Sequence, residues 1–493
     1  MSEVELKFEL PPEAHAAFRR LAPLAEGEAR TERLHAMYFD TPDFELRKRA
    51  MALRLRRERR RWVQCLKAGT SGAGGLHARE EWEFDRQQPS IDVSLLAKTP
   101  FAHEPELGRL DEIFQVDVRR TTWELEVSPG NRVEVALDRG EVSRAGEHSP
   151  ISEVEIESVA GDPMAVFDLA DQLMDVAPLH PSAITKAQRG YRLASGESAT
   201  PAKARPVELD PAWTPGAAAR AVVSAALEQL QANEAGVIES ADPEYLHQFR
   251  VALRRLRSAL RVFRKALEPG FVEVANRELK WVATLTGPAR DWDVLATHTL
   301  PAILSAWGES RSARSVRARV ASRRRSARDA LREALGSPRY ARLVLAIARW
   351  LATPSTEPAQ HAAALGEFAT SVVTKRHRKL LAGARRLSAL PPAERHQLRL
   401  EAKRLRYALD GFETLFRRGR LGAYRELLAE IQDDLGRAND AAVATRLLAD
   451  LKPPGGLAQF ARGWLGAETH SSVQLLGRHA ARLAEARLPR LKP

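Results

Sequence analysis

Two patterns of hydrophobic and polar residues divide the chain. Up to about residue 195, charged and apolar residues alternate in short runs, and this period of two is typical of β-strands. From about residue 217, long segments rich in Ala, Leu and Arg have helical spacing. The stretch between them is rich in Pro, Ala, Ser and Gly and has neither period. We therefore predict a strand-rich domain over 1–195, a linker over 196–216 and an all-helical domain over 217–493.

The predicted strands keep their charges on one face. In the first strand, Glu3, Glu5 and Lys7 alternate with Val4, Leu6 and Phe8, and six further strands follow the same rule. A solvated sheet face would explain any one of them. Seven strands with both signs of charge on one face favour a barrel with that face inward. Buried charges need partners, so we expect a polyanion with a divalent metal inside and the amphipathic segments 11–24 and 162–179 outside.

The helical half contains an internal repeat. The segment that begins HQFRVALRRLR at residue 247 matches HQLRLEAKRLR at 396, and a second pair of motifs, at 287–294 and 436–443, has the same offset of 149 residues. We therefore expect a duplicated helical unit, over about 217–352 and 362–486. Asp291 and Asp440 recur in the second pair, and we interpret them as caps of helices that start after Gly287 and Gly436. Metal binding is the alternative for these two residues.

Each copy of the repeat places its basic residues on one narrow stripe of a helix. The stripes consist of His247, Arg250, Arg254 and Arg257 in the first copy and His396, Arg399, Lys403 and Arg406 in the second. A solvated face is the plain alternative for a single basic helix. Because the stripe is repeated, we favour a site for a linear polyanion recognised by its charge. Nucleic acid is the weaker candidate, since the basic helices lack interleaved aromatic residues for base stacking.

Composition and charge narrow the class of protein. Residues 1–200 carry a net charge of −8 and residues 201–493 a net charge of +20, which suggests two domains with different partners. A hydrophobic content of 44% excludes a wholly disordered chain, and the single Cys65 excludes a disulfide framework or a Cys-rich zinc site. With no apolar run of membrane-spanning length and no secretory leader pattern, we expect a cytoplasmic protein.

The first half resembles the CYTH, or triphosphate tunnel metalloenzyme, superfamily. The resemblance starts with the ExExK motif of Glu3, Glu5 and Lys7. It continues in order through YFDTPD at 38–43, LRLR at 53–56, CLK at 65–67, REEWE at 79–83, RTTW at 120–123, VEVALD at 133–138, EVE at 153–155 and SAITK at 182–186. ExExK alone is a weak pattern, whereas the ordered series is specific.

This resemblance implies an α+β domain, an eight-stranded antiparallel tunnel with flanking helices that hydrolyses a triphosphate with Mg²⁺ or Mn²⁺. The residues implied to bind phosphates are Lys7, Arg54, Arg56, Lys67, Arg79, Arg120 and Lys186. Those implied to bind metal or position water are Glu3, Glu5, Asp138, Glu153 and Glu155. The substrate stays open between inorganic triphosphate, thiamine triphosphate, a nucleoside triphosphate and ATP as a cyclase substrate.

The second half resembles the CHAD domain over about 217–486, through the repeated motifs described above. This resemblance implies two similar helical bundles and inorganic polyphosphate bound in a basic groove between them. We therefore favour an inorganic triphosphatase joined to a polyphosphate-binding domain, with polyphosphate granules as a candidate location. The alternatives are a non-catalytic polyphosphate-binding or granule-associated protein, and a nucleotidase, thiamine triphosphatase or adenylate cyclase.

Overall fold

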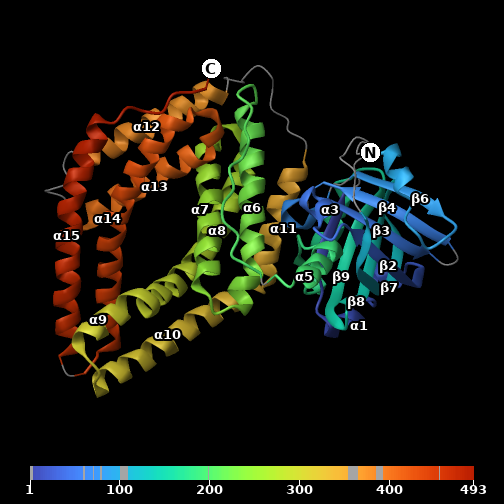
Figure 1. Ribbon diagram of the computed structural model, residues 1–493, viewed down its shortest axis with the longest axis horizontal. Coiled ribbons are helices and arrows are strands. Elements are labelled where there is room, and N and C mark those ends of the chain that lie inside the picture. Colours follow the sequence, from blue (N-terminus) through green and yellow to red (C-terminus); the bar gives the residue numbers. More distant parts are fainter. Residues whose placement is uncertain are drawn as a thin grey trace. The chain divides into compact units, whose positions relative to one another are not determined.

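The computed structural model describes residues 4–58, 61–69, 72–77, 80–99, 109–197, 199–353, 365–384, 392–454 and 456–492. They form two compact units, the first made of 1–200 with 336–354 and the second of 201–335 with 355–493 (Figure 1). Residues 336–354 thus lie in the first unit, although the sequence repeat places most of them in the helical half. Among the described residues, no helix is both long enough and apolar enough to cross a bilayer.

The first unit is built on one antiparallel sheet. Its strands are β1 (Glu5–Glu9), β2 (Ala29–Asp40), β3 (Met51–Glu58), β4 (Arg61–Ala68), β5 (Leu76–His77), β6 (Glu80–Arg86), β7 (Asp111–Ser128), β8 (Asn131–Arg144), β9 (Glu147–Ala160) and β10 (His180–Pro181). Nine strands pair in the order β10-β1-β9-β8-β7-β2-β3-β4-β6, and β5 pairs with β1. The expected count of eight is therefore wrong. The additional strands, β5 and β10, have two residues each, too few to show a period in the sequence.

Short helices surround this sheet. They are η1 (Pro12–Ala14), α1 (His15–Phe18), α2 (Ala22–Ala25), α3 (Glu45–Lys48), η2 (Ala73–Gly75), η3 (Val93–Lys98), α4 (Ala165–Val176), α5 (Lys186–Ser195) and α11 (Pro338–Ala352). The apolar positions of β1, β8 and β9 pack with α4 into one core, which also includes Phe18 and Leu24. As the alternation predicts, the apolar face of these strands points outward under the helices, and burial of that face stabilises the unit.

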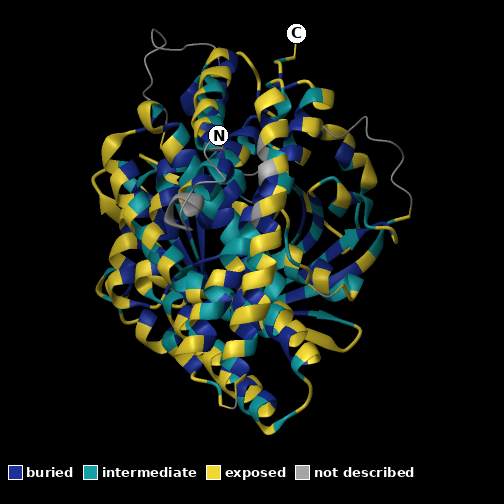
Figure 2. Cartoon of the chain, turned by 90° about the vertical axis from the view of Figure 1, so that its left-hand side faces the viewer, coloured by how far each residue is buried: buried dark blue, intermediate teal, exposed yellow. Residues whose placement is uncertain are grey.

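The second unit consists of helices, most of them long. They are α6 (Pro215–Glu239), α7 (Pro243–Val262), η4 (Arg264–Ala266), α8 (Pro269–Val294), the π-helical turn η5 (Leu295–Thr299), α9 (Leu300–Trp307), α10 (Arg311–Leu335), α12 (Leu365–Ala384), α13 (Pro392–Gly411), η8 (Glu413–Leu415), α14 (Arg418–Leu451) and α15 (Leu457–Glu485). Buried and exposed stripes run along these helices (Figure 2). The two repeated basic motifs lie on α7 and α13, which pack against each other. The arrangement as two similar bundles stays a prediction.

Candidate active site and anion-binding groove

The sheet of the first unit lines a cavity of about 520 Å³. Side chains reach it from β1, β2, β3, β4, β6, β7 and β9 and from the first turn of α5. The predicted residues that line it are Glu5, Lys7, Arg54, Arg56, Lys67, Arg120, Glu155 and Lys186. The charged face of the sheet thus faces a shared cavity.

Strand register brings opposite charges together at one wall of this cavity. On β1 and β9, Lys7 lies opposite Glu155. On β8, Asp138 lies between Arg120 of β7 and Glu153 of β9. Because residues directly opposite in an antiparallel sheet have their side chains on the same face, this pairing forms a compact cluster of three carboxylates with cations around it. We call Asp138, Glu153 and Glu155 the carboxylate cluster.

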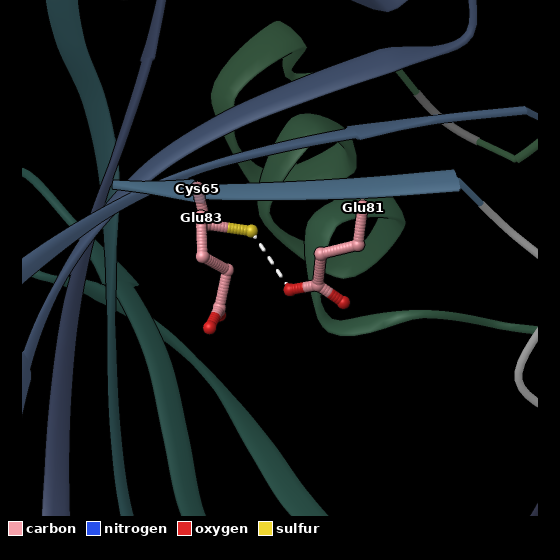
Figure 3. Close-up of side chains that lie close together, drawn as sticks. All are labelled: Cys65, Glu81 and Glu83. Carbon is pink, nitrogen blue, oxygen red and sulfur yellow. Dashed lines mark hydrogen bonds between the residues drawn. The ribbon is translucent and has the colours of Figure 1, made fainter. Parts of the chain in front are cut away.

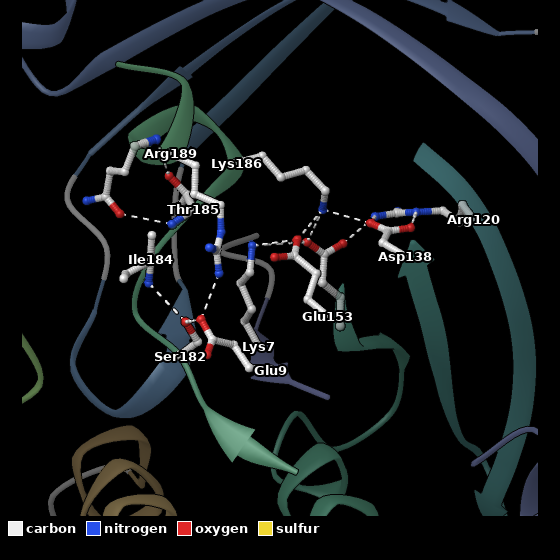
Figure 4. A network of polar contacts seen from close by, with 12 residues as sticks. Lys7, Glu9, Arg120, Asp138, Glu153, Ser182, Ile184, Thr185, Lys186 and Arg189 are labelled. Carbon is white, nitrogen blue, oxygen red and sulfur yellow. Dashed lines mark hydrogen bonds and ion pairs between the residues drawn. The ribbon is translucent and has the colours of Figure 1, made fainter. Parts of the chain in front are cut away.

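Lys186 is the cation that contacts all three members of the carboxylate cluster. Figure 4 shows its position beside Asp138 and Glu153. Its Nζ lies 2.7 Å from Oδ2 of Asp138, 2.5 Å from Oε1 of Glu153 and 2.8 Å from Oε1 of Glu155. Lys186 is the first residue of α5, and Thr185 caps the helix in a capping box with Gln188. The cap therefore fixes the point at which the lysine enters the cavity.

Two further cations contact the carboxylate cluster. Nζ of Lys7 donates to Oε1 of Glu153 over 2.6 Å. Arg120 holds Asp138 with two hydrogen bonds, from Nε at 2.8 Å and from Nη2 at 2.6 Å, and also contacts Glu155. These charges offset one another, so the cluster is stable although Asp138 and Glu153 are fully buried.

The pKa values of the cluster follow from this balance. Burial alone would raise the pKa of Glu155, but Lys186, Arg120 and Lys7 outweigh it and hold that pKa well below its usual value. Glu5 differs, because burial and the neighbouring charge of Glu155 raise its pKa above the usual value despite nearby lysines. The wall thus combines ionised carboxylates with one carboxyl group that binds a proton more readily.

The carboxylate cluster fits a divalent cation with oxygen ligands. Its three residues can each offer an oxygen within 4.8 Å of the other two. Oε2 of Glu153 is also buried without a hydrogen-bond partner among the described residues, which leaves it a free ligand atom. Hard cations such as Mg²⁺, Mn²⁺ and Ca²⁺ prefer carboxylate oxygens, and this set does not distinguish among them.

A second charged wall of the cavity lies on β3, β4 and β6. Its cations Arg54, Arg56 and Lys67 were predicted as site residues, and its acids were not. Glu81 contacts Nζ of Lys67 at 2.6 Å and Nη2 of Arg54 at 3.2 Å, and the thiol of Cys65 donates to it over 2.9 Å (Figure 3). Burial would raise the pKa of Glu81, but Lys67 and Arg54 lower it to about 2. Burial raises the pKa of Cys65 to about 11, so the cysteine is a buried neutral donor.

The set of site residues predicted from the sequence differs from the set found in the structure. Glu3 and Arg79 lie outside the described residues. The cavity lining also includes residues outside the predicted set, among them Tyr38, Glu81, Glu83 and Glu157. The acids among them share the alternating charged positions of their strands, so the signal was present. What was lacking was the register, which places Glu81 opposite Lys67 and Glu83 opposite Cys65.

The second unit contains a groove of about 590 Å³ with a strongly basic lining. Of the predicted stripe residues, His247, Arg250, Arg254, Arg257, Arg399 and Lys403 line it. The groove also includes Arg261, Arg290 and Arg404, which were not among the predicted site residues. Residues from both copies of the repeat therefore meet at one site.

The cations in this groove lower each other's pKa. For Lys403, burial together with Arg254, Arg399 and Arg250 lowers the pKa to about 7. Burial and Arg254 likewise lower the pKa of Arg250 to about 10. The buried Nε atoms of Arg250 and Arg399 have no hydrogen-bond partner among the described residues. Because an anion would relieve both the crowding and the missing hydrogen bonds, the groove has the physical character of an anion site.

The structure departs from two expectations about this groove. Arg406 is absent from the lining, and it contacts Gln432 at 3.2 Å and Asp410 at 3.7 Å. Asp291 and Asp440 do not cap helices, because α8 and α14 continue through Gly287 and Gly436, and both aspartates line the groove. The side chain of His396 lies outside the described residues.

The structure thus has two cavities lined by several cations, one of them beside a carboxylate cluster that fits a divalent cation. Comparisons with known proteins match a family to each half of the chain. The family model described as CYTH domain matches residues 1–191, and the one described as CHAD domain matches residues 221–449. The chain therefore belongs to the proteins that combine a CYTH domain with a CHAD domain.

Individual relatives resemble one half or the other. An inorganic triphosphatase from Haemophilus influenzae is 31% identical over 204 residues, which are 41% of this chain and 57% of that protein. The chain thus matches little more than half of that relative's length. The crystal structure of the CHAD domain from the plant Ricinus communis is 35% identical, covers 60% of this chain and all of that one, and has a TM-score of 0.53.

Proposed function

We propose that the first unit hydrolyses inorganic triphosphate with a divalent metal ion. The observation that carries this proposal is the convergence of Lys7, Arg120 and Lys186, which line the cavity, on the carboxylate cluster. Glu155 of that cluster lines the cavity as well, and Asp138 and Glu153 are buried beside it. The similarity to an inorganic triphosphatase supports this substrate over the organic triphosphates.

The cations of the cavity would bind the substrate. A triphosphate presents oxygens along a short chain, and Lys7, Arg120 and Lys186 on one wall with Arg54, Arg56 and Lys67 on the other would bind its ends. Arg79 stays a proposed member of this set. Each of the six is placed so that phosphate oxygens would replace carboxylate oxygens as its partners, which lowers the cost of opening the existing ion pairs.

The carboxylates would hold the metal and the attacking water. Asp138, Glu153 and Glu155 are the proposed ligands, with Glu3 as a further candidate. When bound, a divalent cation neutralises phosphate charge and lowers the pKa of its water. Glu5, with its raised pKa, is the carboxylate on this wall best suited to accept a proton from water. Phosphoryl transfer then needs the water in line with the leaving oxygen.

Phosphate release from the purified full-length chain tests this proposal. We expect fastest release from inorganic triphosphate, slower release from ATP and thiamine triphosphate, and none in excess chelator. Faster turnover of ATP or thiamine triphosphate would identify that compound, and not inorganic triphosphate, as the substrate. Equal rates with and without chelator would exclude the metal-dependent mechanism.

We further propose that the groove of the second unit binds inorganic polyphosphate. This second function rests on the crowded cations of α7 and α13, whose pKa values are lowered by burial and by one another. A linear polyanion supplies many phosphates to such a groove without base contacts. Competition between long polyphosphate and single-stranded DNA of equal charge for the full-length chain tests it, and tighter binding of the DNA would favour nucleic acid.

A further inference from the structure

Helix α11 lies in the first unit although its sequence falls inside the match to the CHAD domain. It contributes Ala341, Leu345 and Ala348 to the same core that contains Leu6, Phe8, Val154 and Ile156 of the sheet. These three helix residues are at most 1% exposed. Spacings of four and three residues place them on one face of α11, so the whole face is committed to the first unit.

Ion pairs at the edge of this contact join α11 to α4. Arg349 lies 2.6 Å from Asp168 and 3.6 Å from Asp171, and Arg342 contacts Asp175 and donates to the carbonyl of Met174 over 3.2 Å. These side chains are partly exposed, so each pair adds little to stability. The buried face therefore provides most of the contact energy, and the ion pairs set the orientation of the helix.

The contact continues from α11 into the short segment η2. A Cβ atom built on Gly74 would lie 2.4 Å from Cβ of Ala348 and 3.3 Å from the carbonyl oxygen of Val344. Gly74 also has a φ of +76°, a conformation that favours glycine. Only glycine therefore lets η2 lie this close to the helix.

The next residues lead directly to the phosphate-binding strand. A Cβ on Gly75 would lie 2.6 Å from the carbonyl oxygen of Lys7, and β5 then pairs with β1 at Glu5 and Leu6. The same carbonyl of Lys7 accepts a hydrogen bond of 2.9 Å from the backbone of Ser182. A continuous chain of packed atoms thus runs from Ala348 through Gly74 and Gly75 to the backbone of Lys7.

We propose that α11 positions the strand that carries Glu5 and Lys7, so that triphosphate hydrolysis depends on a helix encoded within the CHAD half. Ala348 and Gly74 are positioning residues in this scheme, since neither contacts the cavity. The part of the proposal that concerns hydrolysis rests on the function proposed above. The part that concerns the support of β1 stands on the packing alone.

Gly74→Ala in the full-length chain tests the contact, with Gly130→Ala as its matched control. Gly130 has a similar φ of +80° but no atom within 4 Å of a built Cβ, so it reports backbone strain without the clash. We expect Gly74→Ala to increase hydrogen exchange in peptides covering 4–9 and to lower kcat/KM by about 10- to 100-fold. Ala348→Gly, added to Gly74→Ala, removes the closest clash and should restore part of both.

Leu345→Ala provides a graded second test if Gly74→Ala does not fold. Leu465→Ala is its control, because it creates the same truncation at an equally buried position in a core of the second unit. Leu345→Ala should increase exchange at 4–9 and slow hydrolysis, and Leu465→Ala should do neither. Equal effects of each variant and its control would overturn the proposal. Faster exchange with unchanged hydrolysis would overturn the dependence of the reaction on α11. A wild-type chain inert toward triphosphates would refute the proposed function, and hydrogen exchange would still test the packing.

Discussion

Nζ of Lys186, at the start of α5, lies 2.7 Å from Oδ2 of Asp138 on β8. The two residues are 48 positions apart in the sequence and meet only because α5 begins beside the carboxylate cluster. Asp138 is fully buried, and the charge of Lys186 is one of two that keep its pKa below the usual value against the effect of burial; the other is that of Arg120. This pair therefore links the stability of the first unit to its proposed chemistry.

Lys186→Met should impair both properties. The substitution removes the cation that contacts all three carboxylates, so we expect a loss of about 3 kcal/mol in the free energy of unfolding and of about 100-fold in kcat. Urea unfolding and phosphate release measure the two effects. Lys48→Met is the matched control, because Lys48 is exposed and pairs only locally with Glu45. A Lys186→Met enzyme with full activity would refute the role of this lysine.

Glu5→Gln should preserve the fold and remove most activity. The amide has nearly the same shape but cannot accept a proton or carry a charge, so we expect kcat to fall by about 100-fold or more. Because the pKa of Glu5 is raised in the folded protein, its ionised form costs stability above the pKa, and the neutral amide should not lower the melting temperature at pH 7. An undiminished rate would exclude Glu5 from the reaction.

Polyphosphate binding should weaken as the pH rises through 7. Lys403 has a pKa of about 7 in the free groove, so it is charged below pH 7 and largely neutral above it. A bound polyanion would raise this pKa, and binding above pH 7 must therefore take up a proton. Affinity should fall on the order of tenfold between pH 6 and 8.5. Titration calorimetry in buffers of different ionisation enthalpy measures the proton uptake.

Lys403→Arg separates this effect from other titrating groups. Arginine keeps its charge throughout this range, so the variant should bind with a flatter pH profile. His247 also lines the groove, and burial with Arg290 lowers its pKa, so its own titration lies mainly below that of a free histidine. An unchanged profile in Lys403→Arg would assign the pH dependence to another group.

Charge reversal at two positions of the groove should weaken binding more than reversal at one. Arg254→Glu and Lys403→Glu together should cost more affinity for long polyphosphate than either alone, because the two residues come from different copies of the repeat and line one groove. Arg406→Gln is the informative control, since Arg406 is absent from the groove lining. Binding isotherms at several salt concentrations measure these differences. Unchanged affinity in the double variant, with its helix content intact, would show that the basic stripe is a solvated helix face and not a polyphosphate site.

At the wall of the cavity that carries Glu5 and Lys7, the local alternation of the sequence and the strand register agree. Alternating charges placed Glu5, Lys7 and Glu155 on one face, and the pairing of β1 with β9 then brought Lys7 opposite Glu155. Glu81 was not among the predicted site residues, because its role depends on its contact with Lys67. The two residues lie on different strands, β6 and β4, and only the register of these strands places them opposite each other. Strands of two residues such as β5 contain no period at all.

In the helical half, sequence signals were overridden by packing. Gly287 and Pro288 suggested a helix boundary, yet α8 runs through both, with Ala289 fully buried after them. The cost of an interior proline, about 3 kcal/mol, can be met by the burial of a long amphipathic helix. Helix α11 has a clear helical pattern, but no pattern in one sequence says against which core Ala348 will pack.

The most direct test of the central claim is the rate of phosphate release from inorganic triphosphate by full-length wild-type protein and Lys186→Met, each with added divalent metal and with excess chelator. We expect rapid release by the wild-type protein with metal and at most about 1% of that rate in the other three conditions. Equal rates of wild type and Lys186→Met, or wild-type turnover that persists in chelator, would contradict it.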